Sequence, residues 1–81
     1  MSDKKVLLTN IEKIHTTELG VARIARNLKI ESAGVIDYCK KILVDTKSDV
    51  FKKGKNYYCT LDNIVLTINS YSYTIITAHY L

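Results

Sequence analysis

Two histidines are the side chains of this chain that could exchange protons near neutral pH, and one of them lies in its most regular stretch. Residues 71–81 are rich in β-branched and aromatic types and contain no Gly or Pro, which predicts a strand. Because side chains alternate between the two faces of a strand, Tyr73, Thr77 and His79 would share one face. An imidazole beside hydroxyl groups can act as a general acid or base, so this face is a candidate catalytic surface.

The opposite face of that strand is predicted to point into a core. It would carry Thr74, Ile76, Ala78 and Tyr80, with Ile75 left on the polar face. The open face of a sheet is often only solvated, and Thr and Tyr are ordinary strand formers. A surface without chemistry is therefore the alternative interpretation.

The second histidine, His15, precedes a predicted helix that carries two arginines. Arg23, Arg26 and Asn27 recur at i, i+3 and i+4, which puts them on one face of that helix. Guanidinium groups bind phosphate oxygens in a bidentate manner, so this face suits a phosphate-containing ligand. The alternatives are a solvated helix face and, for His15, a structural hydrogen bond at the start of the helix.

The overall charge also favours a polyanionic partner. The chain has 81 residues, a net charge of +4 and a pI of about 9.1, with lysines clustered at residues 40–41 and 52–55. Surface lysines that keep the protein soluble and protect a sheet edge would give the same pattern. Apolar residues make up 47% of the chain, which indicates one small folded domain rather than disorder.

The cysteine spacing does not suggest a metal or redox motif. Cys39 and Cys59 are far apart and form no C-x-x-C pair, so both are expected to be buried free thiols, and no metal or cofactor is expected. No apolar stretch is long enough to cross a bilayer, and the N-terminal residues do not have the pattern of a signal peptide. A cytoplasmic protein is expected.

The apolar periodicity changes along the chain from a helical pattern to a strand pattern. Residues 1–81 are therefore predicted to form a single α+β domain, with a helical half at 4–43 and a sheet half at 49–81. Short turns favour a three- to four-stranded antiparallel meander with about three helices packed on one face. The helices are expected at residues 4–14, from Thr16 or Thr17 to Leu28, and at 32–43 with Ser32 as N-cap, and the strands at 50–52, 56–61, 64–69 and 71–81.

Residues of the middle strands extend the candidate surface. If the apolar positions face the helices, the other face collects Tyr58 on one strand and Asn69 on the next. Lys55 lies in the predicted hairpin turn at residues 53–55. Tyr58 or Tyr73 could stack on a base, and Lys55 could neutralise a phosphate.

Three segments are more specific than these patterns. They are His15-Thr16-Thr17-Glu18-Leu19-Gly20 with Arg23-Ile24-x-Arg26-Asn27-Leu28, then Gly54-Lys55-Asn56-Tyr57-Tyr58, and last Ile68-Asn69-x-Tyr71-Ser72-Tyr73-Thr74-Ile75-Ile76-Thr77-Ala78-His79. With these segments the chain resembles, over nearly its whole length, a small bacterial family of unknown function found largely in Firmicutes. The family pattern has Trp where this chain has Tyr57, and the resemblance implies no activity.

A second resemblance, at the level of the fold, is to barnase-like, RelE-like and colicin-type ribonucleases. Those domains place N-terminal helices before a four-stranded antiparallel sheet and carry active residues on its open face. The resemblance implies a metal-independent ribonuclease, although a fold alone does not fix a function. His79, His15 and Thr77 would then supply the acid–base chemistry, while Arg23 or Arg26 would stabilise the charge on the phosphate.

The alternative function is a non-catalytic binding or inhibitor module of bacterial or phage origin. Its partner would be RNA, a nucleotide or a protein docked on the sheet face or edge, with no membrane involved. A four-stranded sheet has free edges, so both a monomer and a homodimer are consistent with the sequence.

Overall fold

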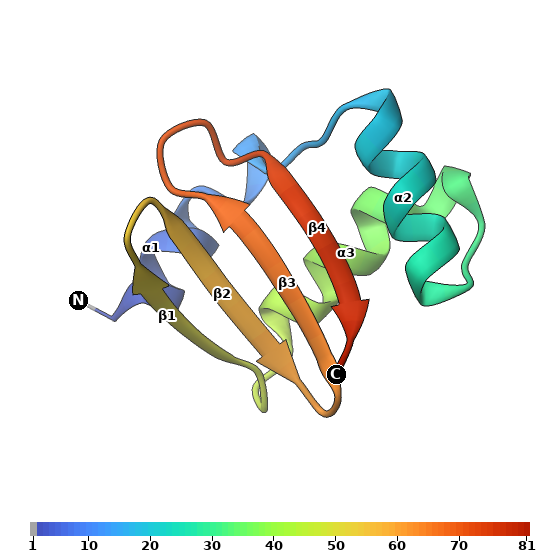
Figure 1. Cartoon of the computed structure of the whole chain (residues 1–81). Coiled ribbons are helices and arrows are strands. Elements are labelled where there is room, and N and C mark those ends of the chain that lie inside the picture. Colours follow the sequence, from blue (N-terminus) through green and yellow to red (C-terminus); the bar gives the residue numbers. More distant parts are fainter. Residues whose placement is uncertain (1) are drawn as a thin grey trace.

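The computed structural model describes residues 2–81, and in this range three α-helices precede one four-stranded sheet (Figure 1). This arrangement confirms the α+β fold expected from the sequence. The elements are α1 (Asp3–Thr9), α2 (Glu18–Leu28), α3 (Val35–Val44), β1 (Asp49–Lys53), β2 (Asn56–Leu61), β3 (Ile64–Asn69) and β4 (Ile75–Tyr80).

The sheet is an antiparallel meander in the order β1-β2-β3-β4. The turn between β1 and β2 has two residues, Gly54 and Lys55, because Lys53 still pairs with Asn56. Gly54 has a φ of 62°, in the left-handed region that glycine adopts without strain, so its place in this hairpin turn is required by the backbone. The predicted turn at 53–55 was one residue too long.

The first and third helices are shorter than predicted. The Ser2 hydroxyl caps α1 by accepting from the Lys5 amide, and the helix ends at Thr9. The Asn10 side chain then donates to the Val6 carbonyl, and a 3₁₀ turn occupies Ile11–Lys13. Asn competes for backbone groups in this way, so the prediction of one helix over 4–14 was wrong.

Helix α3 begins after a 3₁₀ turn at Ser32–Gly34, and Ser32 makes no N-cap hydrogen bond to it. The predicted start at Ser32 was therefore wrong, while the buried stripe was right in Val35, Cys39 and Leu43, which are fully buried. Helix α2 begins as expected from one of the two threonines, since the Thr17 hydroxyl accepts from the Gly20 amide at 3.0 Å.

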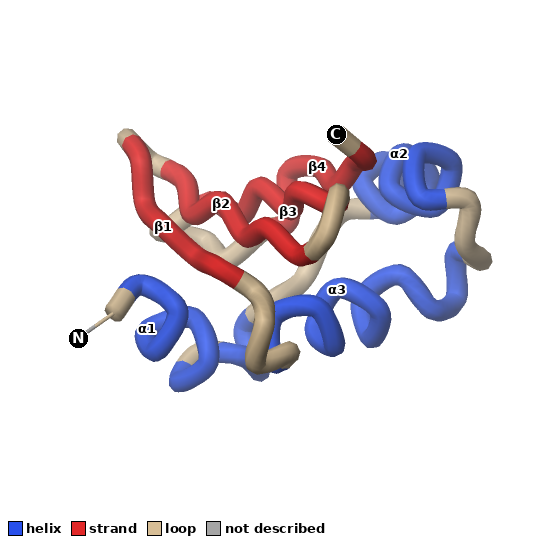
Figure 2. The backbone as a smooth tube through the Cα atoms, turned by 90° about the horizontal axis from the view of Figure 1, so that it is seen from below, coloured by secondary structure: helices blue, strands red, loops and turns tan. Residues whose placement is uncertain are grey.

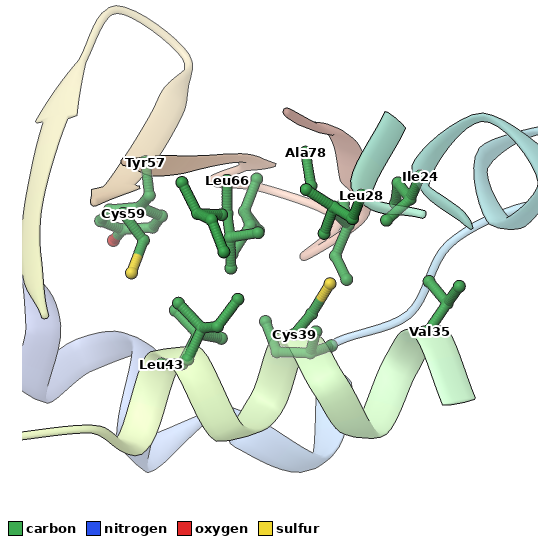
Figure 3. Close-up of a cluster of buried hydrophobic side chains, with 14 of the residues drawn as sticks. Ile24, Leu28, Val35, Cys39, Leu43, Tyr57, Cys59, Leu66 and Ala78 are labelled. Carbon is green, nitrogen blue, oxygen red and sulfur yellow. The ribbon is translucent and has the colours of Figure 1, made fainter. Parts of the chain in front are cut away.

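The helices are not equivalent in their contacts with the sheet. Helices α1 and α3 lie across one face, whereas α2 runs alongside β4 at the edge of the sheet (Figure 2). The core lies between α3 and the sheet and continues under α2, and its side chains come from all these elements (Figure 3). The other face of the sheet carries no helix and is the face seen in Figure 1.

Strand β4 contains a bulge that changes which isoleucine is buried. Thr77 pairs with Thr67, but the next pair joins Ile75 to Ile68, so Ile76 is an extra residue on β4. Ile75 is 1% exposed and Ile76 is 39% exposed. The prediction that Ile76 is buried and Ile75 lies on the open face was wrong, because strict alternation does not hold across a bulge.

Candidate functional site

The open face of the sheet presents side chains in rows that cross the strands. The register places Tyr58, Thr67 and Thr77 in one continuous row, as the alternation predicted for these three residues. Phe51 extends this row on β1. The neighbouring rows contain Asp49, Thr60, Val65 and His79 on one side, and Lys53, Asn56 and Asn69 on the other.

Two aromatic rings form a platform at the β1 end of the central row. The ring centroids of Phe51 and Tyr58 lie 5.5 Å apart with an interplanar angle of 23°, so the rings are stacked. They line an open hollow of about 420 Å³ together with Lys53 and Gly54. Phe51 is 48% exposed, and the sequence reasoning did not identify it as a site residue. A two-residue turn at Gly54 and Lys55 would have placed it opposite Tyr58, and this turn was the signal that could have identified it.

His79 lies on the open face near the end of β4 and is exposed to solvent. Its Nδ1 is 3.0 Å from the carbonyl oxygen of Tyr80. Since a carbonyl can only accept, this contact puts the proton of the neutral ring on Nδ1. The Nε2 atom is then the nitrogen of His79 that can meet a ligand.

His15 is held inside a network of the protein's own hydrogen bonds. Its Nδ1 donates to the Lys13 carbonyl at 2.8 Å, and its Nε2 is 3.1 Å from the Thr74 hydroxyl. Its backbone also forms a parallel bridge at Thr74, with Ile75 donating to the His15 carbonyl at 2.7 Å. The contacts of both ring nitrogens favour the structural interpretation of this residue.

The structure does not bring the two histidines together. His15 is bridged to Thr74, and His79 follows five residues later along β4. Because Ile76 is an extra residue, this stretch lies opposite four steps on β3, from Val65 to Asn69. At about 3.3 Å per residue this corresponds to roughly 13 Å, which is too long for direct proton transfer between the rings. An acid–base pair of His15 and His79 is therefore not formed in this fold.

Helix α2 is fixed to the outer edge of β4 by three side chains. The Thr16 hydroxyl donates to the Ile75 carbonyl at 2.8 Å, the Asn27 amide to the Ala78 carbonyl at 3.2 Å, and the Tyr80 hydroxyl to the Leu28 carbonyl at 3.3 Å. The first two bonds satisfy carbonyl groups that the edge strand would otherwise leave unpaired, and the third satisfies a carbonyl at the C-terminal end of α2. Asn27, which the sequence suggested as a ligand-binding residue, is thus used in holding the helix to the strand.

The two arginines of α2 remain available to a ligand. Arg23 and Arg26 are both exposed, on the helix that borders β4. Lys55 is also exposed, at the turn on the far side of the sheet between β1 and β2. The structure therefore places these cationic residues at two opposite margins of the sheet rather than around one histidine.

Asn69 and Tyr73, two further residues that the sequence suggested for the site, make structural contacts. The Asn69 side chain accepts from the amides of Tyr71 and Ser72, each at 2.9 Å, and so shapes the loop before β4. Tyr73 precedes β4 with a φ of 59° and packs against the core. The Lys13 ammonium lies 5.7 Å from the Tyr73 ring centroid. Tyr73 is therefore not on the open face, and its predicted place beside Thr77 was wrong.

The two buried thiols have raised pKa values and are therefore poorly reactive. Burial, followed by the proximity of Cys59, raises the pKa of the Cys39 thiol to about 12. Burial also raises the pKa of Cys59, against smaller opposing effects of the Ser48 hydrogen bond and Lys4. Among residues 2–81, no three His, Cys, Asp or Glu side chains are grouped as ligands of a metal ion.

The ring hydroxyl of Tyr57 lies on the inner side of the sheet. Burial is the main cause that raises its pKa, and the neighbouring Tyr73 and Asp3 raise it further. Tyr57 is 6% exposed, so it contributes to the core and not to the candidate surface.

Comparison with known proteins identifies a family. A family model described as a protein of unknown function, DUF3781, matches residues 8–79. No curated protein and no solved structure matches the chain, so the resemblance to ribonuclease folds stays a prediction. In the described part of the chain, none of the helices has the length and apolar character needed to cross a bilayer.

Proposed function

We propose that this chain, which belongs to the DUF3781 family of proteins of unknown function, binds single-stranded nucleic acid on the open face of its sheet without cleaving it. The observation that carries the proposal is the stacked pair of the exposed Phe51 and the half-buried Tyr58, which lies beside a lysine on a face without a helix. Proteins that bind single strands commonly combine aromatic rings that stack on bases with cations that bind the phosphates.

The charge around the platform supports this ligand class. Lys53 lines the same hollow as the two rings, and Lys55 follows in the adjoining turn. Gly54 has no side chain, and the space where its Cβ would lie is open, so a ligand can approach the backbone there. A base on the rings and its phosphate near a lysine are therefore sterically compatible.

Catalysis receives less support than binding. Cleavage of RNA through its 2′-hydroxyl needs a base and an acid at the scissile phosphate. His79 is suited to one of these roles, with Thr77 two residues before it, but His15 is about 13 Å away along β4. A ribonuclease that acts through His79 would need a second proton-transfer group other than His15. Ribonuclease activity is therefore the second candidate function, after binding.

The test is fluorescence anisotropy with labelled single-stranded RNA and DNA homopolymers, and with duplexes of the same length. Stacking contributes about 1 to 3 kcal/mol per base, so Phe51→Ala and Tyr58→Ala should each weaken binding about fivefold to 150-fold. The matched control is Tyr71→Ala, because Tyr71 is 76% exposed but lies in the loop before β4. It should bind as the unmodified protein does.

Two results would contradict the proposal. One is the absence of binding to every single strand at low salt, and the other is equal binding by the Phe51, Tyr58 and Tyr71 variants. The same RNA should be incubated with EDTA and resolved by length. Cleavage that persists in EDTA and disappears in His79→Ala would establish the ribonuclease instead, whereas intact RNA supports a binding module.

A further inference from the structure

We infer that the bound strand crosses the sheet at right angles to the β-strands, from the β1–β2 hairpin to α2, where Arg23 and Arg26 form a second phosphate-binding point. This inference rests on the proposed function and specifies the ligand as a single strand that spans both margins of the open face. Its first support is the central row of Phe51, Tyr58, Thr67 and Thr77, which is continuous in register over all four strands, with Thr67 buried between the half-buried Tyr58 and Thr77.

The second support is the orientation of α2. The Asn27 side chain points to the edge of β4, because its amide donates to the Ala78 carbonyl. At about 100° per residue, the buried Ile24 and Leu28 lie on one side of Asn27, while Arg23 and Arg26 lie about 40° and 100° to the other side. Since the buried side faces the core, the arginine side points away from it, on a helix that lies beside β4 at the edge of the sheet (Figure 2).

The third support is electrostatic. Of the rows that flank the central one, one begins on β1 with the Asp49 carboxylate and the other with the Lys53 ammonium. Phosphates are therefore repelled from the Asp49 side and attracted to the Lys53 side. The strand should enter at Lys53, stack on Phe51 and Tyr58, and leave over β4 toward Arg23.

The span sets the length of the ligand. Three interstrand spacings of about 4.8 Å separate β1 from β4, and α2 lies beyond β4. This distance of about 14 Å, plus the step to the helix, exceeds the reach of a single nucleotide. A strand of about four nucleotides, the lower end of the site sizes of small single-strand binding domains, fits the requirement.

The experiment compares two double variants over a series of oligonucleotide lengths, from a dinucleotide to an octanucleotide. Lys53→Gln with Lys55→Gln removes the charge at the hairpin, and Arg23→Gln with Arg26→Gln removes it at α2. The control is Lys40→Gln with Lys41→Gln on α3, in the helical layer away from the open face (Figure 2). All three variants lose the same charge, so a general loss of attraction affects them equally.

The hairpin variant should bind all lengths more weakly than the control. The arginine variant should match the control on dinucleotides and bind more weakly than it from about four nucleotides onward. On the longer strands, its plot of log K against log salt should be shallower by about 0.7 for each phosphate that the arginines no longer neutralise. Equal behaviour of the arginine and control variants at every length would overturn the path while leaving binding intact. Absence of binding by the unmodified protein would instead overturn the proposed function itself.

Discussion

The hydroxyl of Thr16 occupies the space in which a side chain at Gly20 would begin. A Cβ added to Gly20 would collide with Thr16 Oγ1, and the Thr17 hydroxyl lies 3.3 Å from the same point. Thr16 cannot easily turn away, because its hydroxyl donates to the Ile75 carbonyl of β4. The glycine in the first turn of α2 therefore allows the hydroxyl that attaches this helix to the sheet.

Replacing Gly20 by Ala should destabilise the protein although Ala favours a helix by about 1 kcal/mol. The collision with Thr16 either breaks the bond to the Ile75 carbonyl or shifts the helix, so we expect a net loss of about 1 to 3 kcal/mol in the free energy of unfolding. Chemical denaturation measures it. In a Thr16→Ala background the same change should be much less harmful, and strictly additive effects would argue against the collision.

The bulge in β4 leads to opposite expectations for two adjacent isoleucines. Ile75→Ala should cost about 2 to 5 kcal/mol, because Ile75 is 1% exposed and its removal leaves a cavity. Ile76→Ala should cost less than about 1 kcal/mol, because Ile76 is 39% exposed. Thermal and denaturant unfolding of the two variants provides the comparison. A larger effect at Ile76 would mean that β4 has the alternation expected from the sequence and no bulge.

The bulge also shows which side-chain positions in the sheet could not be predicted from the sequence. Alternation correctly assigned Tyr58, Thr67 and His79 to the open face, since each lies in a regular stretch of its strand. It failed at Ile76, because an inserted residue leaves no mark in a run of β-branched side chains. The stacking of Phe51 on Tyr58 depends on the register across a hairpin whose turn was predicted one residue too long.

The specific segment around His15 was noticed in the sequence, but the reason for it required coordinates. Its residues hold α2 and the loop before β4 against the edge of the sheet, as the contacts of His15 with Thr74 and of Thr16 with Ile75 show. Such long-range contacts join residues 59 positions apart. Local periodicity cannot report them, so His15, which is held by structural contacts, and His79, which is exposed on the open face, looked alike in the sequence.

Asn69 should prove to be a structural residue of the loop. Asn69→Ala removes the acceptor of two amide hydrogen bonds and should lower the free energy of unfolding by about 1 to 2 kcal/mol. Asn69→Asp keeps an acceptor at that place and should stay close to the unmodified protein in denaturant unfolding. If both variants unfold like the unmodified protein, the loop does not depend on these bonds.

Ionisation of Cys39 should make the protein less stable in alkaline solution. The thiol has a pKa of about 12 in the folded protein against an ordinary value of 9.0, so between these values the unfolded chain loses a proton that the folded chain keeps. The contribution of the Cys39 thiol to the free energy of unfolding is fully present below pH 9 and is lost as the pH rises toward 12. The expected slope is about 1.4 kcal/mol per pH unit over this window.

Cys39→Ala removes this dependence and leaves the titrating lysines and tyrosines in place. Denaturant unfolding should therefore be measured for both proteins from about pH 8 to about pH 11, and the difference between their stabilities compared at each pH. At pH 8 the variant should have the lower free energy of unfolding, because it lacks the fully buried Cys39 side chain. The gap between the two free energies of unfolding should narrow as the pH rises above 9. A gap that stays constant over this range would show that the Cys39 thiol ionises equally well in the folded and unfolded chains, and hence that α3 does not bury it.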